Sequence, residues 1–214
     1  MNLRVTAYLV IAFLATALTI SSCSDNTTSV EQQPPNNTYP QSIGNRWVYD
    51  VVDSVPPNSV QRYEMIVNVI DTLTLTGNRH LFLWTYTNSF SFPETADTQY
   101  VQVSGDSVVI YDERSESSVF QKYYFPFTVG KEWAGPLDGD TTRIVSLKAV
   151  TLPIQTFFNT YQLRRTIVNG LESATDITIY YVPSIGIIAL NGWDMVGGVK
   201  TYHTWTVLTL RVTT

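Results

Sequence analysis

The feature that most constrains this chain is a nine-residue pattern that occurs twice. The first copy is Tyr39-Pro40-Gln41-Ser42-Ile43-Gly44-Asn45-Arg46-Trp47, and the second is Phe125-Pro126-Phe127-Thr128-Val129-Gly130-Lys131-Glu132-Trp133. Both read aromatic, Pro, any residue, hydroxyl, β-branched, Gly, two polar residues and Trp. Residues 96–101 and 105–110 are echoed more weakly by residues 175–180 and 186–188. An internal repeat predicts two related units, about 39–124 and 125–214, each opening with a turn that brings a Trp into the core.

The residues after Tyr39 are typical of strands. Val, Ile, Thr and Tyr dominate, Ala is scarce, and few stretches put apolar side chains at three- and four-residue spacing. Tyr63, Met65, Val67 and Val69 alternate with polar residues, which predicts a strand with one buried face.

Turn residues separate the predicted strands. Gly77-Asn78, Gly105-Asp106 and Asn169-Gly170 each stand between two strand-like runs, and Gly and Asn tolerate the positive φ angles of tight turns. Consecutive hairpins make an antiparallel meander, and the last strand is expected at about 203–212. We therefore predict an all-β domain over residues 39–214, with a curved sheet that forms a half-open or closed barrel from the two units.

The N-terminus has the form of an export signal. Arg4 is followed by an uncharged, mostly apolar run from Val5 to Ile20, which is shorter than the roughly 20 apolar residues of a membrane-spanning helix. The run ends in Ile20-Ser21-Ser22-Cys23, which is similar to the lipobox of bacterial lipoproteins. We expect residues 1–22 to be a signal peptide and Cys23 to be lipidated, with palmitate among its acyl chains. An ordinary signal peptide, with Cys23 as a bystander, is the alternative.

Cys23 is the only cysteine of the chain, so its acylation would leave no disulfide, thiolate nucleophile or cysteine metal ligand. Residues 24–38 are polar and predict a disordered linker between the lipidated Cys23 and the domain. Ser24 rather than Asp follows the cysteine, which favours the outer membrane within the bacterial cell envelope. The periplasmic and cell-surface faces both stay open.

Charge excludes some partners. Loss of residues 1–22 removes Arg4 and leaves 12 basic and 18 acidic residues. Because basic side chains are scattered, apart from Arg164-Arg165, we expect no nucleic-acid partner. The membrane, through the lipid anchor, and an unidentified protein, glycan or lipid ligand are the partners that remain.

Three segments together resemble a family of uncharacterised bacterial lipoproteins that includes the TapB-like proteins. They are the two Pro-x-x-x-Gly-x-x-Trp turns, the stretch 152–161, and Tyr180-Tyr181-Val182-Pro183-Ser184-Ile185-Gly186. Gln155 and Ser184 stand where that family usually has Gly. The resemblance implies a curved antiparallel sheet similar to the half barrels of lipoprotein-localisation carriers, and it implies no reaction.

Candidate sites for chemistry are few. His80 and His203 lie on predicted strands without a nucleophile elbow nearby, and we interpret them as structural. Asp138-Gly139-Asp140 could contribute to a calcium loop, but the following residues do not complete one and a simple turn is preferred. No catalytic residue, metal ligand or cofactor is predicted.

Aromatic side chains are the remaining candidates for contacts with a ligand. Trp47 and Trp133 are expected to be core anchors. Trp193 stands in the glycine-flanked stretch 191–198, interpreted as a loop, and is the best candidate for an exposed ring that contacts a ligand.

Three classes of function follow in order. The first is a non-catalytic envelope module that binds a protein or glycan, and the second is a carrier or sensor of a hydrophobic ligand in a half barrel. An enzyme is third and would need carboxylates or a histidine converging in one cleft. The interior of the barrel discriminates the first two classes, because an unfilled apolar cavity favours the carrier and a core packed with rings favours the module.

Overall fold

The computed structural model describes residues 39–213, except 77–78, 90–96, 117 and 169–172. Pro35–Thr214 form one compact unit, and the statements below concern this unit alone. The predicted signal peptide, Cys23 and the linker lie outside the described residues.

The domain is all-β, as predicted. Its strands are β1 (Arg46–Val55), β2 (Ser59–Leu75), β3 (Arg79–Asn88), β4 (Asp97–Ser104), β5 (Ser107–Tyr111), β6 (Val119–Tyr124), β7 (Glu132–Ala134), β8 (Asp140–Thr151), β9 (Thr156–Val168), β10 (Ser173–Val182), β11 (Gly186–Val196) and β12 (Val199–Arg211). The predicted hairpin turn at 105–106 is confirmed between β4 and β5. The turns at 77–78 and 169–170 fall outside the described residues, but the strands on either side of each pair antiparallel.

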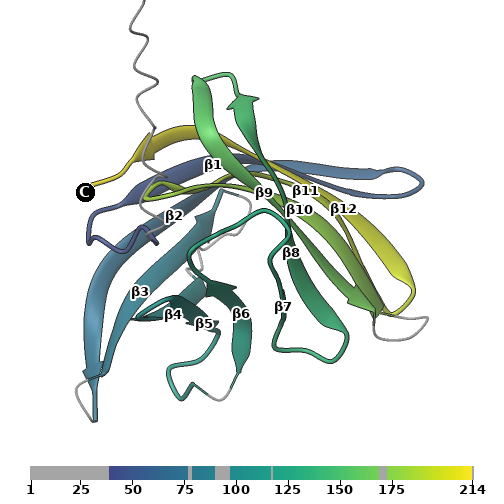
Figure 1. Ribbon diagram of the computed structural model, residues 1–214. Helices are drawn as coiled ribbons and strands as arrows, with labels where there is room; N and C mark the ends of the chain where they lie inside the picture. The colour runs from purple at the N-terminus through teal and green to yellow at the C-terminus, as the bar shows by residue number, and fades with distance from the viewer. Residues whose placement is uncertain (1–38, 77–78, 90–96, 117, 169–172, 214) are drawn as a thin grey trace, which may run out of the picture. The chain divides into compact units, whose positions relative to one another are not determined.

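The sheet is a meander that closes on itself almost completely (Figure 1). Its order is β6-β5-β4-β3-β2-β1-β12-β11-β10-β9-β8-β7, so the first and last strands pair and the two edges are β6 and β7. Every described pairing is antiparallel. The result is a barrel with one unsealed seam, between strands that are consecutive in the sequence.

Bulges help the long strands to curve. The register shifts between Val48 and Tyr49 in the β1–β12 pair, and between Tyr180 and Tyr181 in the β10–β11 pair. An extra residue on one strand bends it and increases its twist. Along β2 the inward face carries Met65, Val67 and Val69, which are 8%, 3% and 1% exposed, in agreement with the predicted alternation.

The two repeated turns have the same backbone hydrogen bonds. Gly44 N–H donates to the Val69 carbonyl at 2.8 Å, and Gly130 N–H donates to the Ile144 carbonyl at 2.8 Å. Both glycines have φ of +91°. The tryptophan that follows each turn is buried, since Trp47 is 1% and Trp133 is 9% exposed. The prediction of Trp47 and Trp133 as core anchors is confirmed.

Replacing Gly44 by alanine is expected to lower the free energy of unfolding by about 1–2 kcal/mol, because an L side chain is strained at this positive φ. A Cβ at Gly44 or at Gly130 would have no atom within 4 Å, so the cost is conformational and not steric. Gly130→Ala should therefore cause a similar loss. Urea denaturation of both variants checks this, and an unchanged midpoint for either one would contradict it.

Candidate functional site: a cavity inside the barrel

The barrel encloses a cavity of about 910 Å³. This volume lies within the range of about 300–1,000 Å³ that is usual for small-molecule sites. Its walls are largely apolar, because the inward faces of the strands line it with side chains such as Met65, Val67, Ile179, Ile187 and Leu190.

Packed aromatic rings gather at one end of the cavity and line it. We call Tyr39, Trp47, Trp84, Tyr123 and Tyr181 the aromatic plug. The Tyr39 ring centroid lies 5.4 Å from that of Trp84 and 6.0 Å from that of Tyr123, and Trp47 stacks on Trp84 at 5.1 Å. Burial raises the pKa of the Tyr123 phenol to about 12, so this hydroxyl stays protonated at neutral pH.

The loop before β11 fixes the plug in place. Trp47 Nε1 donates to the Ile185 carbonyl at 2.8 Å. Gly186 leaves room for Pro40, because a Cβ there would lie 3.0 Å from Pro40 Cγ. The first turn of the repeat thus packs against the loop before β11, in the second half of the chain.

Acidic side chains surround the opposite end. Along β1 the chain runs from Trp47 in the plug to Asp53, which pairs with His203 on β12. Asp97 and Asp112 line the cavity and are exposed, and Asp194 is partly exposed. We call these three residues the acidic rim. Burial, followed by the negative charges of Asp97 and Glu113, raises the pKa of Asp112, against a hydrogen bond from Gln99 that lowers it.

Asp112→Asn is expected to raise the melting temperature at pH 7. A carboxyl whose pKa is higher in the folded state than in the unfolded one disfavours folding when it is charged. The destabilisation by Asp112 is therefore absent when the pH is below the ordinary pKa of an aspartate, about 4. It appears as the pH rises through the raised pKa of Asp112 in the folded state. The gain from Asp112→Asn should vanish near pH 3, as measured by differential scanning calorimetry. A gain that is equal at both pH values would contradict this assignment.

A group of buried polar side chains lines the cavity next to the rim, and one of them, Trp84, also belongs to the aromatic plug. We call Trp84, Gln99, Gln121 and Arg165 the polar wall. They line the cavity and are 6%, 9%, 2% and 9% exposed, respectively. Trp84 pairs with Gln99 across β3 and β4, Gln99 Nε2 donates to Asp112 Oδ1 at 3.4 Å, and Gln121 lies on the edge strand β6.

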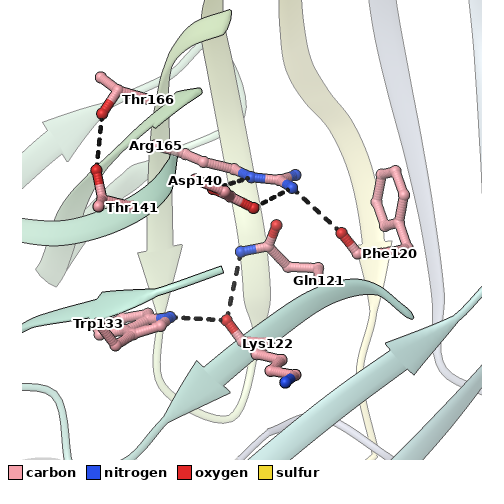
Figure 2. A network of polar contacts seen from close by, with 8 residues as sticks. All are labelled: Phe120, Gln121, Lys122, Trp133, Asp140, Thr141, Arg165 and Thr166. Carbon is pink, nitrogen blue, oxygen red and sulfur yellow. Dashed lines mark hydrogen bonds and ion pairs between the residues drawn. The ribbon is translucent and has the colours of Figure 1, made fainter. Parts of the chain in front are cut away.

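Asp140 holds Arg165 at the seam. Arg165 Nε and Nη2 donate to Asp140 Oδ1 and Oδ2 at 3.1 and 2.8 Å (Figure 2). Nη2 also donates to the Phe120 carbonyl on β6 at 3.2 Å. Trp133 Nε1 donates to the Lys122 carbonyl at 3.0 Å, as Figure 2 also shows. These side chains take the place of a backbone ladder between β6 and β7, and so the unpaired edge is covered from within.

Several polar atoms of the wall lack a partner within the described part of the chain. Trp84 Nε1 and Gln121 Oε1 are buried without a hydrogen bond. The Gln121 amide nitrogen bonds to the Lys122 carbonyl at 3.3 Å, so its oxygen is directed elsewhere (Figure 2). Arg165 uses Nε and Nη2 for its hydrogen bonds to Asp140 and to the Phe120 carbonyl. A polar atom that stays unpaired in the interior costs about 1–3 kcal/mol.

His203 lies between two carboxylates beside the rim. Its Nδ1 is 2.8 Å from Asp53 Oδ1, and Tyr63 donates to the other oxygen of Asp53 at 2.8 Å. Its Nε2 is 3.4 Å from Asp194 Oδ2, a contact close enough for an ion pair but too poorly aligned to count as a hydrogen bond. The cluster ties β1, β2, β11 and β12 together.

This histidine meets part of the requirement for an enzyme, since a histidine and carboxylates converge beside a cavity. A general base also needs a nitrogen free to face substrate, whereas both nitrogens here face carboxylates. Within the described residues no Ser or Thr hydroxyl hydrogen-bonds to His203. The geometry suits a structural bridge better than proton transfer. His80 lies on β3, exposed, with its Nδ1 3.1 Å from Thr74 Oγ1.

The structure corrects the position of Trp193. Residues 191–196 belong to β11 and are not a loop, and the turn is confined to Gly197–Gly198. Gly192 serves close packing, because a Cβ there would lie 2.2 Å from the Asp176 carbonyl oxygen. Since Asp194 faces the cavity, its neighbour Trp193 faces outward, where Lys200 Nζ lies 3.8 Å from its ring centroid.

The Asp138-Gly139-Asp140 segment forms a turn, the preferred interpretation, with Gly139 at φ of +70°. Asp140 is 2% exposed and bonded to Arg165. Among the described residues, no group of three or more His, Cys, Asp or Glu side chains could hold a metal ion. The same residues contain no helix long and apolar enough to span a membrane.

Sequence reasoning missed the polar wall and the acidic rim. Arg164 and Arg165, the adjacent basic pair noted in the sequence, both lie within β9. Strand alternation could have separated them, because one of two neighbours must face inward. Arg164 indeed pairs with Asp176 on the surface, while Arg165 is buried.

Comparison with solved structures supports the fold. The chain is similar to a protein from Bacteroides fragilis described as exported and as having a YmcC-like fold, with 10% identity, a TM-score of 0.50, and coverage of 82% of this chain and 99% of that one. It is also similar to a protein from Parabacteroides distasonis described as a lipoprotein, with 14% identity, a TM-score of 0.47, and coverage of 84% and 100%. No protein-family model and no curated protein matches the chain. The likeness to the Bacteroides fragilis protein shows that the domain has a fold similar to the YmcC-like one.

Proposed function

We propose that this chain is a lipid-anchored protein of the bacterial cell envelope that holds an amphiphilic small molecule, with the apolar part of that molecule inside the barrel. The observation that carries the proposal is the cavity of about 910 Å³ within the barrel. A core filled by its own rings would have favoured a module that binds through its outer surface. The unfilled interior instead favours the carrier or sensor of a hydrophobic ligand.

The shape of the cavity supports an amphiphile in particular. The aromatic plug lines the apolar end, while the acidic rim and the polar wall lie toward the other end. Burial of a hydrocarbon chain contributes about 0.8 kcal/mol per methylene, and so a chain of ten carbons would supply most of the binding energy. We propose that the domain does this without catalysis.

The envelope location rests on the N-terminal residues. The apolar run and Ile20-Ser21-Ser22-Cys23 support export and acylation, and the similar fold of a protein described as exported agrees with it. Membership of the TapB-like lipoproteins and an outer-membrane destination belong to the same proposal.

The ligand can be sought directly. Residues 35–214 contain the whole described core and can be produced without the N-terminal segment. This fragment, purified without detergent, is examined by native mass spectrometry, followed by solvent extraction. A co-purifying amphiphile of a few hundred daltons is expected. A clean apo mass, together with no uptake of added ten-carbon amphiphiles, would overturn the proposal.

Cys23→Ala is expected to abolish the anchor. The variant should incorporate no radiolabelled palmitate and should leave the membrane fraction, because each acyl chain supplies its affinity through buried methylenes. Cys23 is the sole cysteine, so no second thiol could replace it. Acylated Cys23→Ala protein that still sediments with membranes would contradict the lipoprotein assignment.

A further inference from the structure

We propose that the polar wall recognises an uncharged, polyhydroxylated headgroup of the sugar type on the ligand in the cavity. This inference rests on the proposed function and names the class of its ligand. The carboxylates of the acidic rim do not by themselves support this inference. The second and independent observation is that the wall offers an unpartnered donor on Trp84 and an unpartnered acceptor on Gln121, two residues that are more than nine-tenths buried.

The wall presents both kinds of hydrogen-bonding atom. Trp84 Nε1 can only donate, and Gln121 Oε1 can only accept. A hydroxyl group donates and accepts at once, and adjacent hydroxyls on one ring can meet donors and acceptors that stand side by side. A carboxylate, a phosphate or an ammonium headgroup would satisfy one kind of atom and leave the other unpaired.

The charges around the wall favour a neutral head. Arg165 is the one Arg or Lys that lines the cavity among the described residues, and Asp140 already neutralises it through two hydrogen bonds. The acidic rim adds three carboxylates near the opening, which repel an anionic head. A cationic headgroup would be attracted by the carboxylates of the rim, but at the polar wall the positive charge of the Arg165 guanidinium would repel it.

The position of the wall suits a headgroup. Gln99 of the wall bonds to the exposed Asp112, and the wall lines the same cavity as the apolar side chains. A sugar held there would leave its alkyl chain toward Met65, Ile179 and Leu190, with no polar group of the ligand buried among them.

The test uses the 35–214 fragment and amphiphiles with the same ten-carbon tail, all below their micelle concentrations. Decyl maltoside, decanoate and decyltrimethylammonium are titrated while the fluorescence of the cavity tryptophans and the heat of binding are recorded. We expect decyl maltoside to bind at least tenfold more tightly than the two charged compounds. Equal binding of all three would overturn the headgroup inference and leave the proposed function standing. Binding of none would overturn both.

Free maltose separates a lipid-linked sugar from a soluble glycan. We expect maltose without a tail to bind at least 100-fold more weakly than decyl maltoside. Equal affinity for maltose would support recognition by the wall but overturn the role proposed for the apolar part of the cavity.

A variant of the wall gives the matched control. Gln121→Leu removes the free acceptor and should weaken decyl maltoside about tenfold, while binding of 1-decanol stays within twofold. Gln61→Leu is the same substitution at an exposed position of β2 outside the cavity and should change neither affinity. A Gln121→Leu protein that melts like the wild type and keeps its full affinity for decyl maltoside would overturn the inference.

Discussion

Asp140→Ala is expected to lower the free energy of unfolding by about 3–5 kcal/mol, the usual cost of removing one partner of a buried ion pair. The Asp140 side chain is 0% and the Arg165 side chain 11% exposed. Without the carboxylate, the guanidinium would remain inside the barrel and would keep, among the described residues, its hydrogen bond to the Phe120 carbonyl and its contact with the Phe120 ring. The surroundings are built for this pair, since a Cβ at Gly135 would lie 1.9 Å from Asp140 Oδ2.

The neighbouring arginine supplies the control. Arg164 makes two hydrogen bonds with Asp176 at 2.8 Å, the same arrangement as in the buried pair, but its side chain is 55% exposed. Exposed pairs contribute about 0.2–1 kcal/mol, so Asp176→Ala should cost no more than that. Urea denaturation of the two variants measures the difference. Equal losses would show that Arg165 is solvated and that the seam is not closed by this pair.

Trp47→Ala should have a comparable effect, with an expected loss of about 3–5 kcal/mol. The ring is 1% exposed, stacks on Trp84 and donates to the Ile185 carbonyl. Its removal would leave a void in the aromatic plug and an unpaired carbonyl on the loop before β11. Because Trp47 lines the cavity, the variant should also admit water there and lose affinity for an apolar ligand.

Trp193→Ala is the control for this substitution. Trp193 faces outward on β11 under Lys200, so its loss should cost about 1 kcal/mol or less and leave ligand binding unchanged. Thermal denaturation and fluorescence titration of both variants test the comparison. A larger loss for Trp193→Ala than for Trp47→Ala would contradict the assignment of Trp47 to the core.

The strands and the closing turns were predictable because their signals are local. Alternation of Met65, Val67 and Val69 identifies one buried face, and Gly44 and Gly130 identify positions that need a positive φ. The pairing of the first strand with the last was not predictable, because a meander of hairpins fits an open sheet as well as a barrel. The decisive pairing joins β1 to β12, where Arg46 pairs with Arg211 from the far end of the domain.

The candidate site could not be predicted from local sequence patterns, because its residues come from different strands. Asp140 and Arg165 come from the paired strands β8 and β9, whereas Phe120 comes from β6 and reaches Arg165 because the sheet curves round to its other edge. The prediction that Trp193 lies in a loop was wrong because glycines flank it, as they often do in loops. Gly192 is instead required by the close approach of the β10 backbone, a contact between strands that composition cannot reveal.

The most direct test of the central claim is where a bound apolar chain lies. The 35–214 fragment is mixed with a neutral ten-carbon amphiphile that carries a photoreactive diazirine at the tail end, irradiated, digested and sequenced by mass spectrometry. The account predicts adducts on cavity residues such as Met65, Ile179 and Leu190. Adducts confined to exposed apolar residues of the outer surface, such as Phe158 and Val60, would contradict it.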